Sequence, residues 1–239
     1  MSTTAPEDVR ARAVMILAAG GAGPTALEGS VRDVAPRMRA AIGSGGSLRA
    51  GVRHADDPLG AAMGDRGALE PVDAVIEMTA ASDASPADVV ALAGALAGEL
   101  GDAVDLERSA VVAGWVHRFL SEDGALFVAL AGFRDPSISM DELSRWWLEE
   151  HGPLALRIVQ PSPRAYEQLH ADHDASRAAS EAAGVPYGGY DMYDTIAVDS
   201  MDDLMTAMMN PEVATALFED ELGHVDHARL RGAVQRTLV

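Results

Sequence analysis

The sequence predicts an α+β fold in which two β-α-β-β-α-β units of one chain pack sheet to sheet as an intrachain α/β barrel. Three observations predict it: apolar runs alternate with capped helical segments, one motif frame occurs twice, and 239 residues are ample for a core. A sheet that carries helices on one face leaves its other face exposed, and a duplicated chain supplies its own partner for that face.

The repeated frame is S-x-R-A followed by H-A-D, which occurs at residues 47–56 and again at 162–172. Further pairs keep the same order along the chain, among them Asp73 with Asp194 and Gly114 with Gly232. We therefore divide the chain at residues 121–124, into a degenerate unit at 1–121, expected to be a structural mate, and a second unit at 122–239.

In the first unit, apolar runs predict strands at 13–19, 48–54, 74–78 and 110–120. Pro24 opens a helix that Gly43 ends, and Ser85 caps a second helix, with Asp88 completing a capping box. The expected helices are therefore 24–42 and 86–100, with a loop at 43–46.

The second unit repeats the pattern, with strands expected at 125–133, 164–170, 195–199 and 232–239. Ser139 and Glu142 form a capping box that opens a helix reaching about residue 159. Another helix is expected from Met201 to Leu222, broken near Pro211, and residues 172–189 are expected to form a loop.

Composition excludes several kinds of chemistry. The sequence has no cysteine, and all 18 of its basic residues are arginine, so a thiol nucleophile, a Schiff-base lysine and a cysteine-bound metal are excluded. A net charge of -19 disfavours nucleic acid and anionic membranes as partners. The N-terminus has no signal-peptide pattern, and no apolar run is long enough for a membrane helix, so we expect a cytoplasmic protein.

One segment resembles the opening of an EthD domain: a strand ending in Arg134, a loop with Pro136, a Met-containing helix start, and an aromatic pair before His-Gly-Pro-Leu at 151–154. Segments 193–204 and 219–226 resemble the family's later blocks, so the resemblance covers about 124–239. It implies a ferredoxin-like fold of the dimeric α/β-barrel superfamily. It also implies a pocket between sheet and helices, and relatives that convert aromatic or polyketide metabolites without a bound cofactor.

With cysteine and lysine absent, histidine is the natural general acid or base near neutral pH. His151 is the first candidate because a position at a helix end would raise its pKa, although a histidine that only caps the helix fits equally well. We also expect His170 and Asp194 in the catalytic group, with Asp194 orienting a histidine. Both have counterparts in the first unit, His54 and Asp73, so a shared structural role stays open.

The predicted pocket walls come from aromatic residues and a methionine-rich helix. A strand with regular alternation places Tyr166, Gln168 and His170 on one face. The expected substrate-binding residues are Trp147, Tyr166, Tyr190, Tyr193, Met205 and His224. Ordinary core packing is the alternative for the methionines. The first unit has Val34 in place of His151, so we expect chemistry in the second unit only.

No metal or cofactor is expected. His170 with His173, and His224 with His227, offer nitrogen ligands beside aspartates, but each pair supplies only two of the three or four ligands of a real site. The glycines at 20–23 lack the context of a nucleotide-binding turn.

We therefore expect a cofactor-free enzyme of aromatic or polyketide-type secondary metabolism, in which histidine acid/base chemistry in an apolar pocket drives a cyclisation, dehydration or isomerisation. The alternatives are a cofactor-independent monooxygenase of a polyphenolic substrate, and an accessory ligand-binding protein without turnover. Because the barrel is complete within one chain, either a monomer or a homodimer of fused barrels is compatible with the sequence.

Overall fold

The strands of the computed structural model form one sheet in the order β2-β4-β1-β5-β7-β8-β6-β9, and β2 also pairs with β9, so eight strands close into a barrel. A ninth strand, β3, adds parallel to β9. The structure describes residues 6, 8–63, 69–208 and 210–239. The predicted α+β barrel within one chain is confirmed.

The first half supplies β1 (Asp8–Ala19), α1 (Pro24–Ile42), β2 (Ser47–Arg53), α2 (Leu59–Met63), β3 (Leu69–Glu70), β4 (Ala74–Thr79), α3 (Pro86–Leu100), the 3-10 turn η2 (Gly101–Ala103) and β5 (Val104–Ser121). The second half supplies β6 (Leu126–Gly132), α4 (Met140–Trp146), η3 (Trp147–His151), α5 (Gly152–Ile158), β7 (Ala165–Ala171), α6 (His173–Ala183), β8 (Met192–Val198), α7 (Met201–Ala207), α8 (Pro211–Glu221), the 3-10 turn η4 (His227–Arg229) and β9 (Leu230–Thr237).

Both halves order their strands in the same way. The first half runs β5-β1-β4-β2 and the second runs β9-β6-β8-β7, which is the ferredoxin-like order in each case. The halves meet at two antiparallel seams, β5 with β7 and β2 with β9. The topology therefore repeats, while the residue-by-residue correspondences and the division at residue 121 stay predictions.

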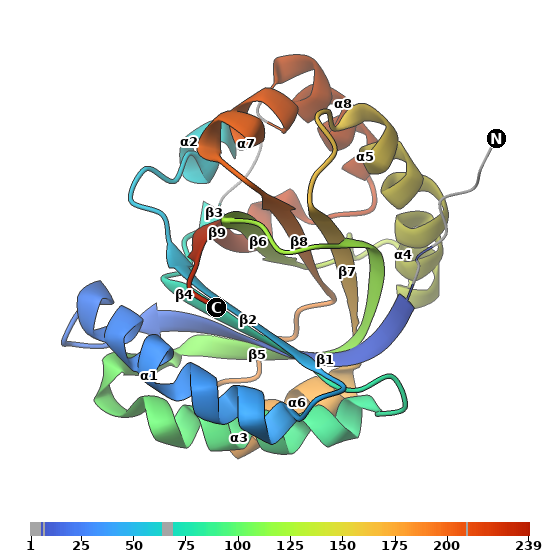
Figure 1. The fold of residues 1–239 in the computed structure, drawn as a ribbon. Coiled ribbons are helices and arrows are strands. Elements are labelled where there is room, and N and C mark those ends of the chain that lie inside the picture. The colour runs from blue at the N-terminus through green and yellow to red at the C-terminus, as the bar shows by residue number, and fades with distance from the viewer. Residues whose placement is uncertain (1–5, 7, 64–68, 209) are drawn as a thin grey trace.

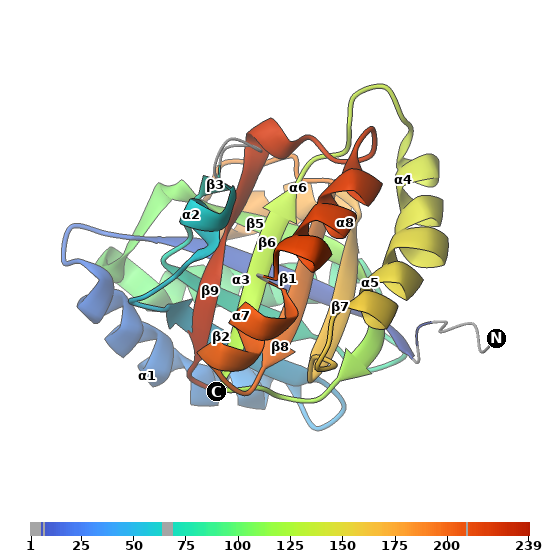
Figure 2. The same ribbon diagram turned by 90° about the horizontal axis from the view of Figure 1, so that it is seen from above.

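Helices lie outside the barrel in two groups (Figure 1). α1, α3 and α6 cover one side, whereas α4, η3, α5, α7 and α8 cover the opposite side, as the view from above also shows (Figure 2). No helix in the described part of the chain has the length and apolar character that crossing a bilayer demands.

Helix α6 corrects the expectation of a loop at 172–189. The side chain of Asp172 caps the helix by accepting a hydrogen bond from the Ala175 backbone N–H at 3.0 Å. Ala175, Ala179 and Ala183 are buried in the same core as α1 and α3, although α6 belongs to the second half of the chain. The helix was missed because its apolar face consists of alanine, which gives little contrast in an alanine-rich sequence.

The barrel interior contains a buried cluster of charges at one end. Glu167 accepts hydrogen bonds from Arg12 at 3.0 Å, Arg49 at 2.7 Å and Arg118 at 2.8 Å. Glu77 pairs with Arg49 at 2.8 Å. Burial opposes ionisation of Glu167, but the guanidinium groups of Arg12 and Arg49 outweigh it and hold the pKa of that carboxyl well below its usual range. The cluster thus joins strands of both halves.

Separating the halves is expected to abolish independent folding. Residues 1–121 or 122–239 alone would leave two seam strands unpaired, expose the inner face of a sheet and separate α6 from α3. Each fragment should aggregate or form heterogeneous oligomers in size-exclusion chromatography and bind a hydrophobic dye, while the full chain should elute as one monomeric or dimeric species and not bind the dye. Two soluble monomers that each unfold cooperatively would contradict the fused barrel.

Candidate active site

The floor of the candidate site is the outer face of the second half of the barrel. One row across the sheet consists of directly paired residues, Gln168 on β7, Asp194 on β8, Leu130 on β6 and Gly232 on β9. Gln168 Nε2 donates to the Tyr166 hydroxyl at 2.7 Å, which places the two side chains on one face as expected.

The roof is a helix that contains a π-turn. The Ser139–Glu142 capping box begins it, α4 passes into the π-helical turn η3, and α5 continues to Ile158. In the π-turn the carbonyl oxygen of Trp147 accepts from the backbone N–H of Gly152, and it also accepts from Gln168 Nε2 at 3.0 Å. Turns of this kind occur frequently at functional sites.

Gly152 allows the roof to approach the floor this closely. A Cβ at this position would lie 2.9 Å from the Phe119 ring and 3.2 Å from Gln168 Nε2, so a larger residue would push the helix away from the sheet. The helix also continues beyond His151, which corrects the expectation that His151 ends it. Capping and the helix-dipole effect both act at the last turn of a helix. Because His151 lies before that turn, neither effect accounts for its position.

His151 is buried, with 6% of its surface exposed, and its ring lies 4.9 Å from that of Trp146. Its Nδ1 lies 2.8 Å from Oδ2 of Asp220 on α8. Because a carboxylate only accepts, Nδ1 donates, and in the neutral form of the imidazole the lone pair then lies on Nε2. Asp220, rather than Asp194, therefore orients the histidine. No sequence pattern indicates this pairing, because the two residues lie in different blocks of the chain.

Asp194 lies on an inner strand, between β7 and β6, and not at a sheet edge. Its Oδ1 atom is shielded from solvent and has no partner among the described residues. Burial, reinforced by the nearby charge of Glu221, raises the pKa of Asp194 to about 7, although His151 opposes the change. A carboxyl group with this pKa exchanges protons at neutral pH.

Two further histidines reach the site from the loop after α8. His227 Nε2 lies 2.7 Å from Oε2 of Glu221. The His224 ring stacks on that of Trp146, with centroids 4.1 Å apart and planes inclined by 2°. Histidines therefore contact both acidic residues at the end of α8: His151 binds Asp220, and His227 binds Glu221.

Roof and floor enclose a cavity of about 30 Å³, which is room for about one water molecule. Its lining residues are Leu130, Gly132, Trp146, Trp147, His151, Met192, Asp194, Glu221, Val225 and Leu230. Of the predicted site residues, His151, Asp194 and Trp147 thus meet at one cavity, with an apolar wall. Glu221 joins them and was not predicted, although it stands in the acidic block at 219–226.

His170 lies beside this cavity. Its Nδ1 is 3.0 Å from the Ser144 hydroxyl, its ring contacts Trp147, and its Nε2 has no partner in the described structure. Burial, with a smaller contribution from His117, lowers the pKa of His170 to about 3. The imidazole is therefore neutral at neutral pH and is unsuited to carry a proton there.

Three predicted substrate-binding residues lie elsewhere. The Tyr193 hydroxyl donates to Glu77 inside the barrel at 2.7 Å, Tyr190 packs on Phe133 in the barrel interior, and Met205 is 46% exposed. Neighbours on a strand point to opposite faces, so Tyr193 and Asp194 cannot share a pocket. These three residues therefore do not line this cavity, and their role in substrate binding stays a prediction.

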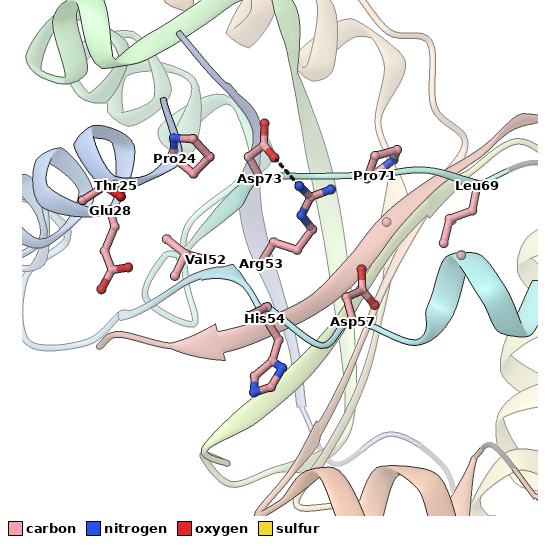
Figure 3. A pocket seen from close by; sticks show the side chains of 13 residues that line it. Pro24, Thr25, Glu28, Val52, Arg53, His54, Asp57, Leu69, Pro71 and Asp73 are labelled. Atoms are coloured by element: carbon pink, nitrogen blue, oxygen red, sulfur yellow. Dashed lines mark ion pairs between the residues drawn. The ribbon is translucent and has the colours of Figure 1, made fainter. Parts of the chain in front are cut away.

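A larger hollow of about 570 Å³ lies at the β2–β9 seam (Figure 3). Its charged groups already have partners: Arg53 pairs with Asp73 at 3.3 Å, and Asp57 Oδ1 accepts from two backbone N–H groups. The outer face of β7 and β8, in contrast, holds three buried polar atoms, those of Gln168, His170 and Asp194, that find no partner in the described part of the chain. Such atoms favour the smaller cavity as the functional site.

The suggested histidine pairs do not converge. His173 contacts the Tyr187 hydroxyl and Asp191, away from His170, and His224 and His227 bind different partners. Within the described residues no three His, Asp or Glu side chains are grouped so that they could hold a metal ion.

Comparison with known proteins agrees with this location. The model of the EthD domain matches residues 135–228. No curated protein matches the sequence. Among solved structures, the chain is similar to a protein described as anthrone oxidase-like, with 11% identity, a TM-score of 0.62, and coverage of 98% of this chain and 94% of the other.

A protein of Lactobacillus acidophilus NCFM, provisionally described as a monooxygenase, has 9% identity and a TM-score of 0.51, over 97% of this chain and 94% of the other. A variant of DypB from Rhodococcus jostii RHA1 in complex with haem has 15% identity and a TM-score of 0.49, over 97% and 94%. At such identities, the likeness to the first two structures shows the fold alone.

The EthD model thus covers most of the second half of the chain, and the resemblance of that half to the family is confirmed. The matched segment contains Trp146, His151, Asp194 and Glu221, which line the cavity. The first half and the residues that line the larger hollow lie outside the match.

Proposed function

We propose that this protein is a cofactor-free enzyme that transfers protons on a small aromatic or polyketide-like substrate, and so catalyses a cyclisation, dehydration or isomerisation. One observation carries the proposal: a histidine oriented by an aspartate and a carboxyl group with a pKa of about 7 face the same small apolar cavity. Enzymes that transfer protons commonly use two titratable groups whose different environments move their pKa values apart, so that one serves as the acid and the other as the base.

His151 serves as the base. Asp220 holds its Nδ1, so the Nε2 lone pair takes a proton from a carbon next to a substrate carbonyl. Asp194 serves as the acid and gives its proton to the departing hydroxyl group in a dehydration, or to the receiving atom in an isomerisation. Burial raises the pKa of Asp194 to about 7, and Glu221 reinforces the effect because two adjacent carboxylates disfavour a second negative charge.

The apolar wall suits a planar substrate. Trp146, Trp147, Leu130 and Met192 supply ring and aliphatic surface beside the two polar groups. The present cavity is too small for such a molecule. Because α8 contains no buried residue, it can open to admit the substrate and must then close around it, so that Asp220 and Glu221 regain their places beside His151 and Asp194 before the chemistry.

Asp194→Asn is the direct test of the acid. An amide gives no proton, so the rate should fall by about 10² or more, and the wild-type rate should decline as the pH rises through about 7. Because the folded pKa lies above that of the unfolded chain, the stability contributed by Asp194 is present below about pH 4 and is lost as the pH rises through 7.

The Asn variant should therefore be more stable than the wild type at pH 8, by about 1 to 3 kcal/mol once partial exposure is allowed for, and the difference should shrink at pH 5. Urea unfolding at both pH values measures it. A wild-type rate that is flat between pH 6 and pH 8, together with an active variant, would remove Asp194 from the mechanism.

A cofactor-independent monooxygenase is the second candidate, and the descriptions of two structural neighbours favour it. There His151 would deprotonate an anthrone-like carbon, the carbanion would reduce dioxygen and form a C–O bond, and loss of water from the hydroperoxide would leave a quinone. Anthrone and related polyphenols incubated under argon and under air distinguish the candidates. Turnover under argon supports proton transfer alone, product only in air supports oxidation, and binding without product indicates an accessory role.

A further inference from the structure

Gln168 and Asp194 each present a buried oxygen without a partner. They are directly paired across β7 and β8, and both side chains lie on the outer face of the sheet. The Gln168 side chain is fully buried, and neither its Oε1 nor Asp194 Oδ1 has a hydrogen-bond partner among the described residues. Side chains directly opposed in an antiparallel pair have Cβ atoms about 4.5 to 5.5 Å apart, which is within reach of one hydrogen bond between these side-chain ends.

The orientation of the Gln168 amide is fixed by its other contacts. Its Nε2 donates to the Trp147 carbonyl oxygen at 3.0 Å and to the Tyr166 hydroxyl at 2.7 Å. Reversing the amide would place Oε1 against the Trp147 carbonyl, and two acceptors at that distance repel each other. Oε1 therefore needs another donor, and Asp194 is the residue directly paired with Gln168 across the sheet.

We propose that Gln168 holds Asp194 in its protonated form by accepting a hydrogen bond from the Asp194 carboxyl group at Oε1. One proton between the two side chains satisfies both oxygens, whereas an ionised Asp194 would leave two acceptors facing each other in a buried place. The inference rests on the proposed function only for the use of that proton, because the hydrogen bond itself does not depend on the reaction.

The groups that face Asp194 agree with a neutral acid. Glu221 from α8 disfavours a second negative charge, while His151 from η3 opposes this effect. Tyr166 on β7 is uncharged, since burial, reinforced by Asp194, raises its pKa well above 10. The neighbour on β6 is Leu130, which bears no charge.

Gln168 is a positioning residue that links the acid to the roof. Its amide nitrogen binds the carbonyl of Trp147, which begins the π-turn carrying His151. The Gln168 amide thus contacts both sides of the site. Its oxygen accepts the proton of Asp194, and its nitrogen holds the π-turn that carries His151.

Infrared difference spectroscopy on the full chain tests the proposal without any substrate. At pH 6 the wild type should show the carbonyl stretch of a protonated carboxylic acid that Asp194→Asn abolishes. In Gln168→Met this band should move to higher frequency, because the acid loses its acceptor, and its disappearance on raising the pH should occur about 1 pH unit lower. Gln235→Met is the matched control, since Gln235 is also fully buried with an unpartnered Oε1 but lies on β9, and it should leave the band unchanged.

Absence of an Asp194 band at pH 6, or a band that Gln168→Met does not move, would overturn the proposal. If Gln168→Met does not fold, the wild-type spectrum alone tests the proposal. An Asp194 band at the frequency of a carboxylic acid without a hydrogen bond would also exclude the hydrogen bond to Gln168. Loss of the proposed enzymatic function would instead appear as absent turnover with these spectra unchanged, so the two failures are distinguishable.

Discussion

Replacing Glu167 by glutamine is expected to lower the free energy of unfolding by about 3 to 5 kcal/mol, the largest effect on stability that we foresee for one substitution. The carboxylate is fully buried and receives hydrogen bonds from Arg12, Arg49 and Arg118. Glutamine keeps the shape but removes the charge, and its amide NH₂ turns a donor toward guanidinium groups that are themselves donors. Positive charges from both halves of the chain would then stand in the barrel without full compensation.

Urea unfolding at pH 7 measures this loss, with Glu99→Gln as the control, because the Arg37–Glu99 pair is exposed and such pairs contribute about 0 to 1 kcal/mol. The difference between wild type and Glu167→Gln should narrow below about pH 4. The pKa of Glu167 is lowered in the folded chain, so its contribution is present above the unfolded pKa and is lost as the pH falls. A variant within 1 kcal/mol of the wild type would show that the two halves do not depend on this cluster.

The elements that the sequence predicted well are those with local causes. Pro24 and Gly43 bound α1 as expected, the Ser85 and Ser139 caps begin their helices, and the chain breaks between α7 and α8 before Pro211. Strand β8 begins at Met192, before the expected Thr195, because its first residues gain their pairing from β6 and β7. Helix α6 depends in the same way on distant contacts, such as the close approach of Gly94 to Ala182.

The residues of the candidate site show the same contrast between those that the local sequence indicates and those that depend on distant contacts. His151, Trp147 and Asp194 were identified from residue type and resemblance, and the fold brings them to one cavity. Asp220 and Glu221 reach it only because α8 folds back over the roof. The π-turn depends on the amide of Gln168, which lies on another strand and leaves no mark in the sequence around Trp147.

His151→Ala is expected to lower turnover by about 10² to 10⁴, the range typical for removal of a general acid or base. The substitution removes the Nε2 lone pair from the cavity, while Asp220, 24% exposed, regains water as a partner. We therefore expect a small change in melting temperature beside a large change in rate. The measurement is kcat with the substrate found in the argon and air experiments, together with a thermal melt, and added imidazole should restore part of the rate.

The matched control is His54→Ala, which removes the histidine that lines the larger hollow of the first half. It should leave turnover unchanged, because we place the chemistry in the second half. Val34, the expected counterpart of His151 in the first unit, is a poorer control, since it is buried in the core and Val34→Ala would lower stability. Full activity in His151→Ala would remove the base from the mechanism and favour oxidation driven by the substrate's own acidity. A parallel loss of stability and activity would instead indicate that His151 mainly holds α8 to the roof through Asp220.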